Sequence, residues 1–142
     1  MKLIPVTCAL IIHDGKVLAA QRSEGMDLPG KWEFPGGKVE EGEDPRDCLA
    51  RELREELSIE VIVGEALAPS DFSYPTKIIR LLPFLAVWKA GAIRLQEHSQ
   101  VAWLGRESLF SVDWAEADIP IVHDLHDNWV KLANPTNAQK HG

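Results

Sequence analysis

The amino-acid sequence predicts an α+β fold, an α/β/α sandwich in which a mixed, curved β-sheet lies between two helices. Three observations favour this class: apolar, β-branched runs separated by turns fill much of the chain, one amphipathic helix begins near Pro45, and a second helical pattern follows Ile121. The 142 residues, 45% of them apolar, suffice for one core. We therefore expect a single domain over residues 1–133 and a flexible polar tail over residues 134–142.

The first part of the chain predicts a β-hairpin followed by a loop. Ile4 to Ile12 are almost continuously apolar, as in a strand covered on both faces, and the Asp-Gly turn of residues 13–16 leads into a partner strand from Val17 to Arg22. Residues 23–31 contain two glycines and a proline and are expected to form a loop. The run Trp32 to Pro35 then leads to a pair of glycines.

The helix near Pro45 has both a start signal and an apolar stripe. Asp44 is a suitable N-cap, Pro45 suits the first helical position because its missing N–H would be unpaired there, and Asp47 meets the positive end of the helix dipole. The apolar stripe recurs at every fourth residue: Leu49, Leu53 and Leu57. We expect this stripe to contact the sheet.

Further strands and a last helix follow. Ile59 to Val63 predicts a short strand, and residues 72–74 and 78–88 predict a hairpin-like pair. Pro83 lies inside the longer run, which favours a sheet edge or a bulge there because proline has no N–H for the ladder. After a strand from Val101 to Leu104, a C-terminal helix is expected to bury one side: Ile121, Leu125, Trp129 and Leu132.

Composition excludes several classes of function. A formal net charge of -7 leaves no extended basic surface for a nucleic-acid polymer. No apolar run resembles a signal-peptide core or approaches the length of a membrane span, so we expect a cytoplasmic protein without membrane contact. Cys8 and Cys48 have no Cys or His at metal-ligand spacing and are expected to be small buried residues without a disulfide.

The second face of the first helix carries a group of carboxylates. Glu52, Glu55 and Glu56 stand at positions i, i+3 and i+4 and share one surface. Like charges this close destabilise each other, so the group requires a cation, and hard oxygen ligands suit Mg²⁺, with Mn²⁺ as the alternative. An ordinary solvated acidic helix is the competing interpretation.

Neighbouring residues favour the metal interpretation. Glu43 precedes the helix, Arg51 is a candidate ion-pair partner for it, and Gly36 and Gly37 form a turn able to present bare backbone. The spacing from Gly37, G-x5-E-x7-R-E-L-R-E-E-L-S-I, resembles the signature of the Nudix hydrolases, G-x5-E-x7-R-E-U-x-E-E-x-G-U with U aliphatic. Ser58 stands where the family has glycine, and we expect it to cost ~1 kcal/mol at the helix end without affecting the chemistry.

The resemblance covers nearly the whole chain and supports the sandwich arrangement. It implies a hydrolase in which divalent ions bridge the phosphate chain and protein oxygens: the Gly36 carbonyl, Glu52, Glu55 and Glu56. Glu52 is the implied general base, with Glu97 as its rival. Glu43 and Arg51 would hold the loop and the helix together behind the metal ligands.

The run WEFPGGKVE resembles the MutT-like branch in particular. This likeness implies that Arg22 contacts substrate phosphate, that Phe34 lies near the base, and that Glu97, in E-H-x-x-V-x-W, binds metal or helps to activate water. Simpler alternatives are a surface arginine, a core phenylalanine and a loop glutamate. We interpret the neighbouring His98 as a loop residue.

Three further residues are candidates for contact with the substrate. Asp118 would cap the last helix or, by the resemblance, reach the edge of the base, where an ionised carboxylate favours donors such as the cytosine amino group. Lys77 and Arg80 would face the phosphates or the ribose, with solvated strand charges as the alternative. His123 and His126 have no third ligand in view, so we expect no zinc site.

The implied activity is that of a Mg²⁺-dependent nucleoside triphosphate pyrophosphohydrolase that releases a nucleoside monophosphate and pyrophosphate. The arrangement E-H…W-L…A-D-I-P is more similar to the CTP pyrophosphohydrolase relatives and favours CTP, dCTP or modified pyrimidine nucleotides. The alternatives are an 8-oxo-dGTP diphosphatase, which sanitises the nucleotide pool and serves DNA repair, and a non-catalytic nucleotide-binding regulator. The expected partner is a small nucleotide, and the base, the sugar, the number of metal ions and the choice between monomer and homodimer stay open.

Overall fold

The structure, a computed structural model, describes residues 1–133 and confirms the α+β class. The predicted tail, residues 134–142, lies outside the described residues. In the described part, the strands are β1 (Lys2–His13), β2 (Lys16–Gln21), β3 (Trp32–Glu33), β4 (Gly36–Lys38), β5 (Glu60–Ala66), β6 (Ser70–Tyr74), β7 (Lys77–Ala90) and β8 (Gln100–Leu104). The helices are α1 (Pro45–Leu57), α2 (Ile119–Asp127), α3 (Trp129–Leu132) and a short 3₁₀ helix (Arg106–Ser111).

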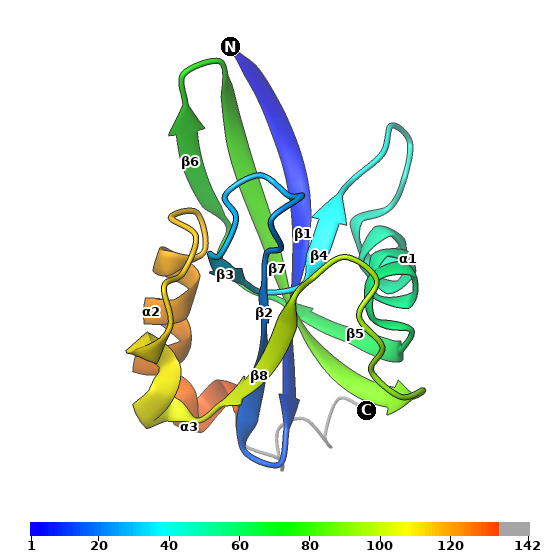
Figure 1. Cartoon of the computed structure of the whole chain (residues 1–142), viewed down its shortest axis with the longest axis vertical. Coiled ribbons are helices and arrows are strands. Elements are labelled where there is room, and N and C mark those ends of the chain that lie inside the picture. Colours follow the sequence, from blue (N-terminus) through cyan, green and yellow to red (C-terminus); the bar gives the residue numbers. More distant parts are fainter. Residues whose placement is uncertain (134–142) are drawn as a thin grey trace.

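The strands form one mixed sheet, with α1 on one side of it and α2 and α3 on the other (Figure 1). β1 and β7 run parallel at its centre, and the other strand pairs are antiparallel. The path through the sheet is β3-β2-β1-β7-β5, with β4 beside β1, β6 beside β7 and β8 beside β2. β1 pairs with β4 over residues 6–8 but with β2 only at residues 12–13, so β4 meets β1 near its middle.

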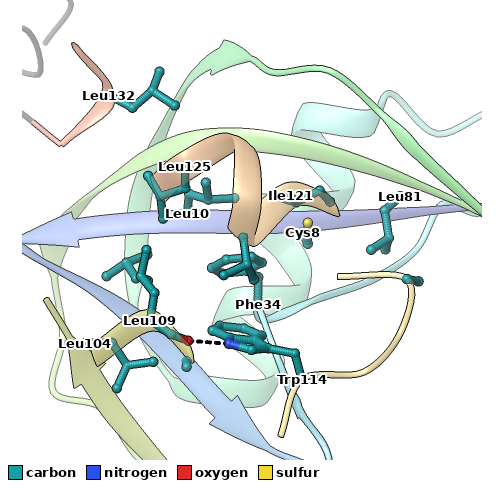
Figure 2. Close-up of a cluster of buried hydrophobic side chains, with 14 residues drawn as sticks. Cys8, Leu10, Phe34, Leu81, Leu104, Leu109, Trp114, Ile121, Leu125 and Leu132 are labelled. Carbon is teal, nitrogen blue, oxygen red and sulfur yellow. Dashed lines mark hydrogen bonds between the residues drawn. The ribbon is translucent and has the colours of Figure 1, made fainter. Parts of the chain in front are cut away.

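The alternation of side chains along β1 divides the core between the two faces of the sheet. Ala9 and Ile11 belong to the cluster under α1, which includes the predicted leucine stripe: Leu49, Leu53 and Leu57. Cys8 and Leu10 belong to the cluster under α2, with Phe34 and Trp114 (Figure 2). The indole N–H of Trp114 donates to the Leu109 carbonyl at 2.6 Å, which satisfies its one polar group inside this cluster.

Of the two expectations for Pro83, the sheet edge is wrong and the bulge is confirmed. It lies in β7, inside the sheet, opposite Cys8 of β1. Its carbonyl accepts the N–H of Leu67 at 2.9 Å, so its nitrogen also faces the side of β5 and β6. The register shifts there, between Val63 and Ala66, and β6 takes over from β5 as the partner of β7. The missing N–H is therefore tolerated at an irregularity within the sheet.

The start of α1 is as predicted from the sequence, whereas the C-terminal helix differs from the prediction. Asp44 caps α1 by accepting the N–H groups of Arg46 and Asp47 at 3.0 and 3.3 Å, as predicted. Ser58 ends this helix in the left-handed conformation, with φ of 60°, and donates its N–H to the Arg54 carbonyl at 3.1 Å. The predicted C-terminal helix is instead two helices, α2 and α3, separated at Asn128.

Both cysteines are buried and free, as expected. No helix among the described residues is long and apolar enough to cross a membrane.

Candidate functional site

The two glycines of β4 lie where the backbone meets its neighbours too closely for a side chain. A Cβ atom on Gly36 would lie 2.0 Å from the carbonyl oxygen of Thr7 in β1. A Cβ atom on Gly37 would lie 2.3 Å from the carboxyl carbon of Glu52 in α1. Glycine at these positions therefore lets β4 fit between β1 and α1, and it places the Glu52 carboxylate directly on the Gly37 backbone.

The hydrogen bonds around β4 determine where the Gly36 carbonyl points. Ala9 donates to the Pro35 carbonyl at 2.8 Å and Val39 donates to the Pro5 carbonyl at 3.0 Å. Facing residues of an antiparallel pair alternate between hydrogen-bonded and non-hydrogen-bonded positions, so Gly36, next to Pro35, is in a non-hydrogen-bonded position. Its carbonyl is directed away from β1.

Arg51 organises the acidic face of α1. Its guanidinium donates to both carboxylate oxygens of Glu43, at 2.8 and 3.0 Å, and to Glu52 and Glu55, at 3.1 Å each. The hydrogen bonds from Arg51 lower the pKa of Glu43 to about 2. Glu43 and Arg51 thus join the loop before α1 to the helix.

Glu56 lies on the inner side of the same helix, where its charge has no such partner. Burial, followed by the charges of Glu52, Glu33 and Glu97, raises its pKa to about 9. Its Oε2 atom is buried and has no hydrogen-bond partner among the described residues. Burial also raises the pKa of Glu52, against the opposing effect of Arg51. Glu97, although exposed, lies near enough to Glu56 for its charge to contribute.

These features fit a divalent cation. Mg²⁺ and Mn²⁺ prefer oxygen donors. The site offers the carboxylates of Glu52, Glu55 and Glu56, which repel one another, and the Gly36 carbonyl, which points away from β1. In the part of the chain that the structure describes, no three acidic, histidine or cysteine side chains already form a complete ligand set. Glu52 and Glu55 are instead paired with Arg51, at 3.1 Å each.

A cavity of about 530 Å³ adjoins this acidic face. This volume lies in the range of small-molecule sites. Gly36, Gly37 and Glu56 contribute to its wall, as do Phe34 and Asp118 from the other face of the sheet. The cavity therefore connects the carboxylates of α1 with the start of α2.

Asp118 does not cap α2 with its side chain but turns toward β3. Its Oδ2 atom accepts the backbone N–H of Phe34 at 2.9 Å, and only 4% of the residue is exposed. Burial and the charge of Glu33 raise its pKa well above the usual range, which favours the protonated form. The raised pKa thus favours a carboxylic acid, which has an O–H donor as well as an acceptor, over the ionised acceptor expected from the sequence. Phe34 serves both as core and as cavity wall, with its ring centroid 4.7 Å from that of Trp114.

The structure brings two of the three predicted cationic residues to the cavity. Arg22 and Lys77 contribute to its wall, and the Lys77 ammonium lies 5.7 Å from the centre of the Tyr74 ring. Arg80 lies apart from the wall and forms an ion pair with Asp71 at 2.8 Å, with both side chains about half exposed. Arg80 thus has the geometry of a solvated strand charge.

Two residues at the site were not predicted. Glu33, in the wall of the cavity, accepts a hydrogen bond from Arg22 at 2.7 Å. His98, expected to be a loop residue, has a fully buried side chain whose Nε2 atom lies 2.9 Å from Glu33. Glu33 belongs to the run WEFPGG, so its position was visible in the sequence, but nothing near His98 in the sequence indicates burial.

Comparisons with known proteins identify the family that this chain resembles. The family model of the NUDIX domain matches residues 2–125. The CTP pyrophosphohydrolase of Escherichia coli K12 is 43% identical over 122 residues, which cover 86% of this chain and 90% of that protein. The 8-oxo-dGTP diphosphatase of Haemophilus influenzae is 34% identical over 125 residues, which cover 87% and 92%.

A solved structure leads to the same family. The crystal structure of a MutT protein from Methanosarcina mazei superposes with a TM-score of 0.80 at 27% identity, covering 92% of this chain and 96% of that one. The fold, the spacing from Gly37 to Ile59 and the match over nearly the whole described chain all agree. The chain therefore belongs to the NUDIX domain family of hydrolases.

Proposed function

We propose that the protein is a Mg²⁺-dependent nucleoside triphosphate pyrophosphohydrolase that converts CTP, dCTP or a modified pyrimidine nucleotide to the monophosphate and pyrophosphate. One observation carries the proposal: an acidic helix face with an unpaired buried carboxylate borders a cavity of nucleotide size that also contains Asp118. The 43% identity to a CTP pyrophosphohydrolase supports the choice of base.

The residues that would hold Mg²⁺, or Mn²⁺ in its place, are Glu52, Glu55, Glu56, the Gly36 carbonyl and Glu97 of the loop before β8. The bound cation would neutralise phosphate charge and polarise the reacting phosphoryl group. Glu52 and Glu55 would leave Arg51 to reach this position, while Glu43 would keep its two hydrogen bonds to the guanidinium. Arg51 would therefore stay paired in both arrangements.

Glu52 is the proposed general base for a water that attacks the β-phosphorus in line with the leaving oxygen. Its carboxylate lies against Gly37, beside the cavity wall, and burial raises its pKa toward the range useful for proton transfer. Glu97 is the alternative base, and it is exposed in the loop before β8. Arg22 and Lys77, both in the cavity wall, would contact phosphate or sugar.

Asp118 and Phe34 are proposed to recognise the base. A protonated Asp118 that accepts the Phe34 N–H on one oxygen can donate from the other. Cytosine N3 is an acceptor for such a donor, and the cytosine amino group can bond to a remaining lone pair. This pairing with a neutral acid replaces the pairing with a carboxylate that the sequence suggested.

A second candidate substrate is 8-oxo-dGTP, and one observation favours it. A neighbouring cavity of about 250 Å³ shares Leu28, Tyr74 and Ala115 with the main cavity. The added space would accommodate a base larger than a pyrimidine. Hydrolysis of this nucleotide is the activity in the name of the H. influenzae relative.

The test is the release of pyrophosphate and phosphate, with and without Mg²⁺, from a panel of nucleotides. The panel contains CTP, dCTP, 5-methyl-dCTP, 8-oxo-dGTP, dGTP, ADP-ribose and a dinucleoside polyphosphate. Metal-dependent pyrophosphate release that is fastest with a cytosine nucleotide supports the first candidate, and a preference for 8-oxo-dGTP supports the second. Release of phosphate instead of pyrophosphate, or no release by a folded sample, would contradict both. We place this activity in the cytoplasm, with the free nucleotide pool.

A further inference from the structure

Three polar side chains form a chain that leads from the cavity wall into the interior, and the chemistry proposed above does not use its inner end, His98. His98 lies just before β8, Glu33 lies in β3 and Arg22 follows β2. β2 pairs with β3 at Gln21–Trp32 and with β8 at Gln21–Gln100, which brings these three segments together. His98 Nε2 is 2.9 Å from one oxygen of Glu33, and Arg22 donates to the other oxygen at 2.7 Å.

The environment of His98 assigns a role to its Nε2 atom. The side chain is completely buried, and Nδ1 has no hydrogen-bond partner among the described residues. Because an ionised carboxylate only accepts, Nε2 must be the nitrogen that carries the proton toward Glu33. An apolar side chain could fill the same space without burying polar atoms. What histidine adds at this position is therefore one hydrogen bond to Glu33.

Glu33 transmits this restraint to Arg22. The Arg22 guanidinium bonds to Glu33 through Nη1 and to the Asp27 carbonyl through Nε. These two bonds fix the plane of the guanidinium, which has five N–H donors in a rigid arrangement. Arg22 is also in the cavity wall, with 20% of its side chain exposed, so the remaining donors are available to an anionic ligand.

The charge of Glu33 also has to be compensated, by His98 and Arg22, because it acts on the rest of the cavity. Its charge raises the pKa of Glu56 at one part of the cavity and of Asp118 at another, so it acts on both. An unpaired carboxylate at this position would repel the phosphates of a nucleotide. His98 and Arg22 bind one oxygen each and thereby neutralise and orient it.

We propose that His98 is a positioning residue for substrate binding, which acts through Glu33 to hold the Arg22 guanidinium in the orientation that contacts the phosphates of a nucleotide. The inference rests on the proposed function, since Arg22 needs a phosphate ligand. His98 is absent from the cavity wall, so it would not touch a substrate bound there. It therefore affects binding more than the chemical step.

The experiment compares His98→Leu, His98→Gln and the control His123→Leu, which changes an exposed histidine of α2. KM and kcat are measured with the best nucleotide of the panel, and the Kd of CTP is measured by calorimetry in EDTA. For His98→Leu we expect KM and Kd to rise about 10-fold, with kcat within about twofold of wild type, because a hydrogen bond to a charged group is lost. His98→Gln restores a donor and should stay within about threefold, and His123→Leu should match wild type.

A double variant tests the route through Arg22. Arg22→Ala alone should raise KM and Kd, and adding His98→Leu to it should raise them no further, because the two changes remove the same restraint. Additive effects would overturn the inference, as would a fall in kcat at unchanged KM or equal loss in His98→Leu and His98→Gln. A wild type that binds CTP without hydrolysing any nucleotide refutes the proposed function, while its Kd values still decide the role of His98. A wild type that neither binds nor hydrolyses refutes both.

Discussion

We predict that the buried carboxylate of Glu56 makes metal affinity depend on pH. Burial and neighbouring charges raise its pKa to about 9, whereas a carboxylate must lose its proton to bind a cation. At pH 7 about 1% of Glu56 is then ionised in the free protein. The fraction rises to about a quarter at pH 8.5, so the apparent Kd for Mn²⁺ should fall about 25-fold between pH 7 and pH 8.5.

Calorimetric titration with Mn²⁺ measures both parts of this prediction. Titrations at pH 7 in two buffers of different ionisation enthalpy should show the release of about one proton per ion bound. Glu56→Gln should abolish the proton release and the dependence on pH. The matched control is Glu60→Gln, because Glu60 is half exposed and pairs with Arg54 instead of facing the cavity. A Kd that is constant between pH 7 and 8.5, or a dependence on pH that persists in Glu56→Gln, would refute the reasoning.

Three further changes test single contacts. Glu52→Gln should lower kcat at least ~10²-fold while the Tm stays near that of wild type, as expected for loss of a general base. An active, folded variant would remove Glu52 from that role. A larger loss of kcat in Glu97→Gln would assign the role to Glu97. Gly37→Ala should lower kcat at least about 10-fold, because the new Cβ would lie 2.3 Å from the Glu52 carboxyl carbon and displace it. Gly25→Ala, whose Cβ would meet no atom within 4 Å, is its control, and equal kinetics in both variants would contradict the argument. Ser58→Gly should raise the free energy of unfolding in urea by about 0.5 kcal/mol at unchanged kcat. Glycine removes the steric strain of the left-handed backbone, but it also increases the entropy of the unfolded chain, which offsets part of the gain. A decrease in the free energy of unfolding would show that the serine is not strained.

The parts of the fold that the sequence predicts well are those where local signals and packing agree. The Asp44 cap, Pro45 and the leucine stripe all indicate the same helix, and α1 begins and ends where they place it. The short strands β3 and β4 were not predicted, since residues 32–33 and 36–38 carry almost no period of their own. Their strand conformation comes from pairing with β2 and β1. The apolar pattern also does not reveal the break between α2 and α3 at Asn128, because Leu125, Trp129 and Leu132 keep a nearly helical spacing across it.

The site, like the fold, has features that the sequence predicts and features that it does not. The acidic face of α1 follows from spacing alone, because residues at i, i+3 and i+4 of a helix must share a surface. The pair of Glu33 and His98 joins residues 65 positions apart, and although Glu33 stands in the run WEFPGG, nothing in the sequence indicates that the two meet. The raised pKa of Asp118 likewise depends on burial beside the Phe34 N–H, a contact between residues 84 positions apart. Contacts between distant segments, and the pKa shifts that follow from them, are thus the part that sequence reasoning missed.

The carboxylates around α1 occupy two electrostatic states, and this difference explains how an acidic site can accept an anionic substrate. Glu43 has a lowered pKa because Arg51 bonds to both of its oxygens. Glu56 has a raised pKa because it is buried beside other carboxylates without such a partner. Glu56 would therefore stabilise a bound cation most, because its charge has no other partner among the described residues. Glu43 would stabilise the cation little, because Arg51 already compensates its charge. Arg51 would keep Glu43 when a metal ion draws Glu52 and Glu55 away, so metal binding leaves neither the guanidinium nor a carboxylate unpaired.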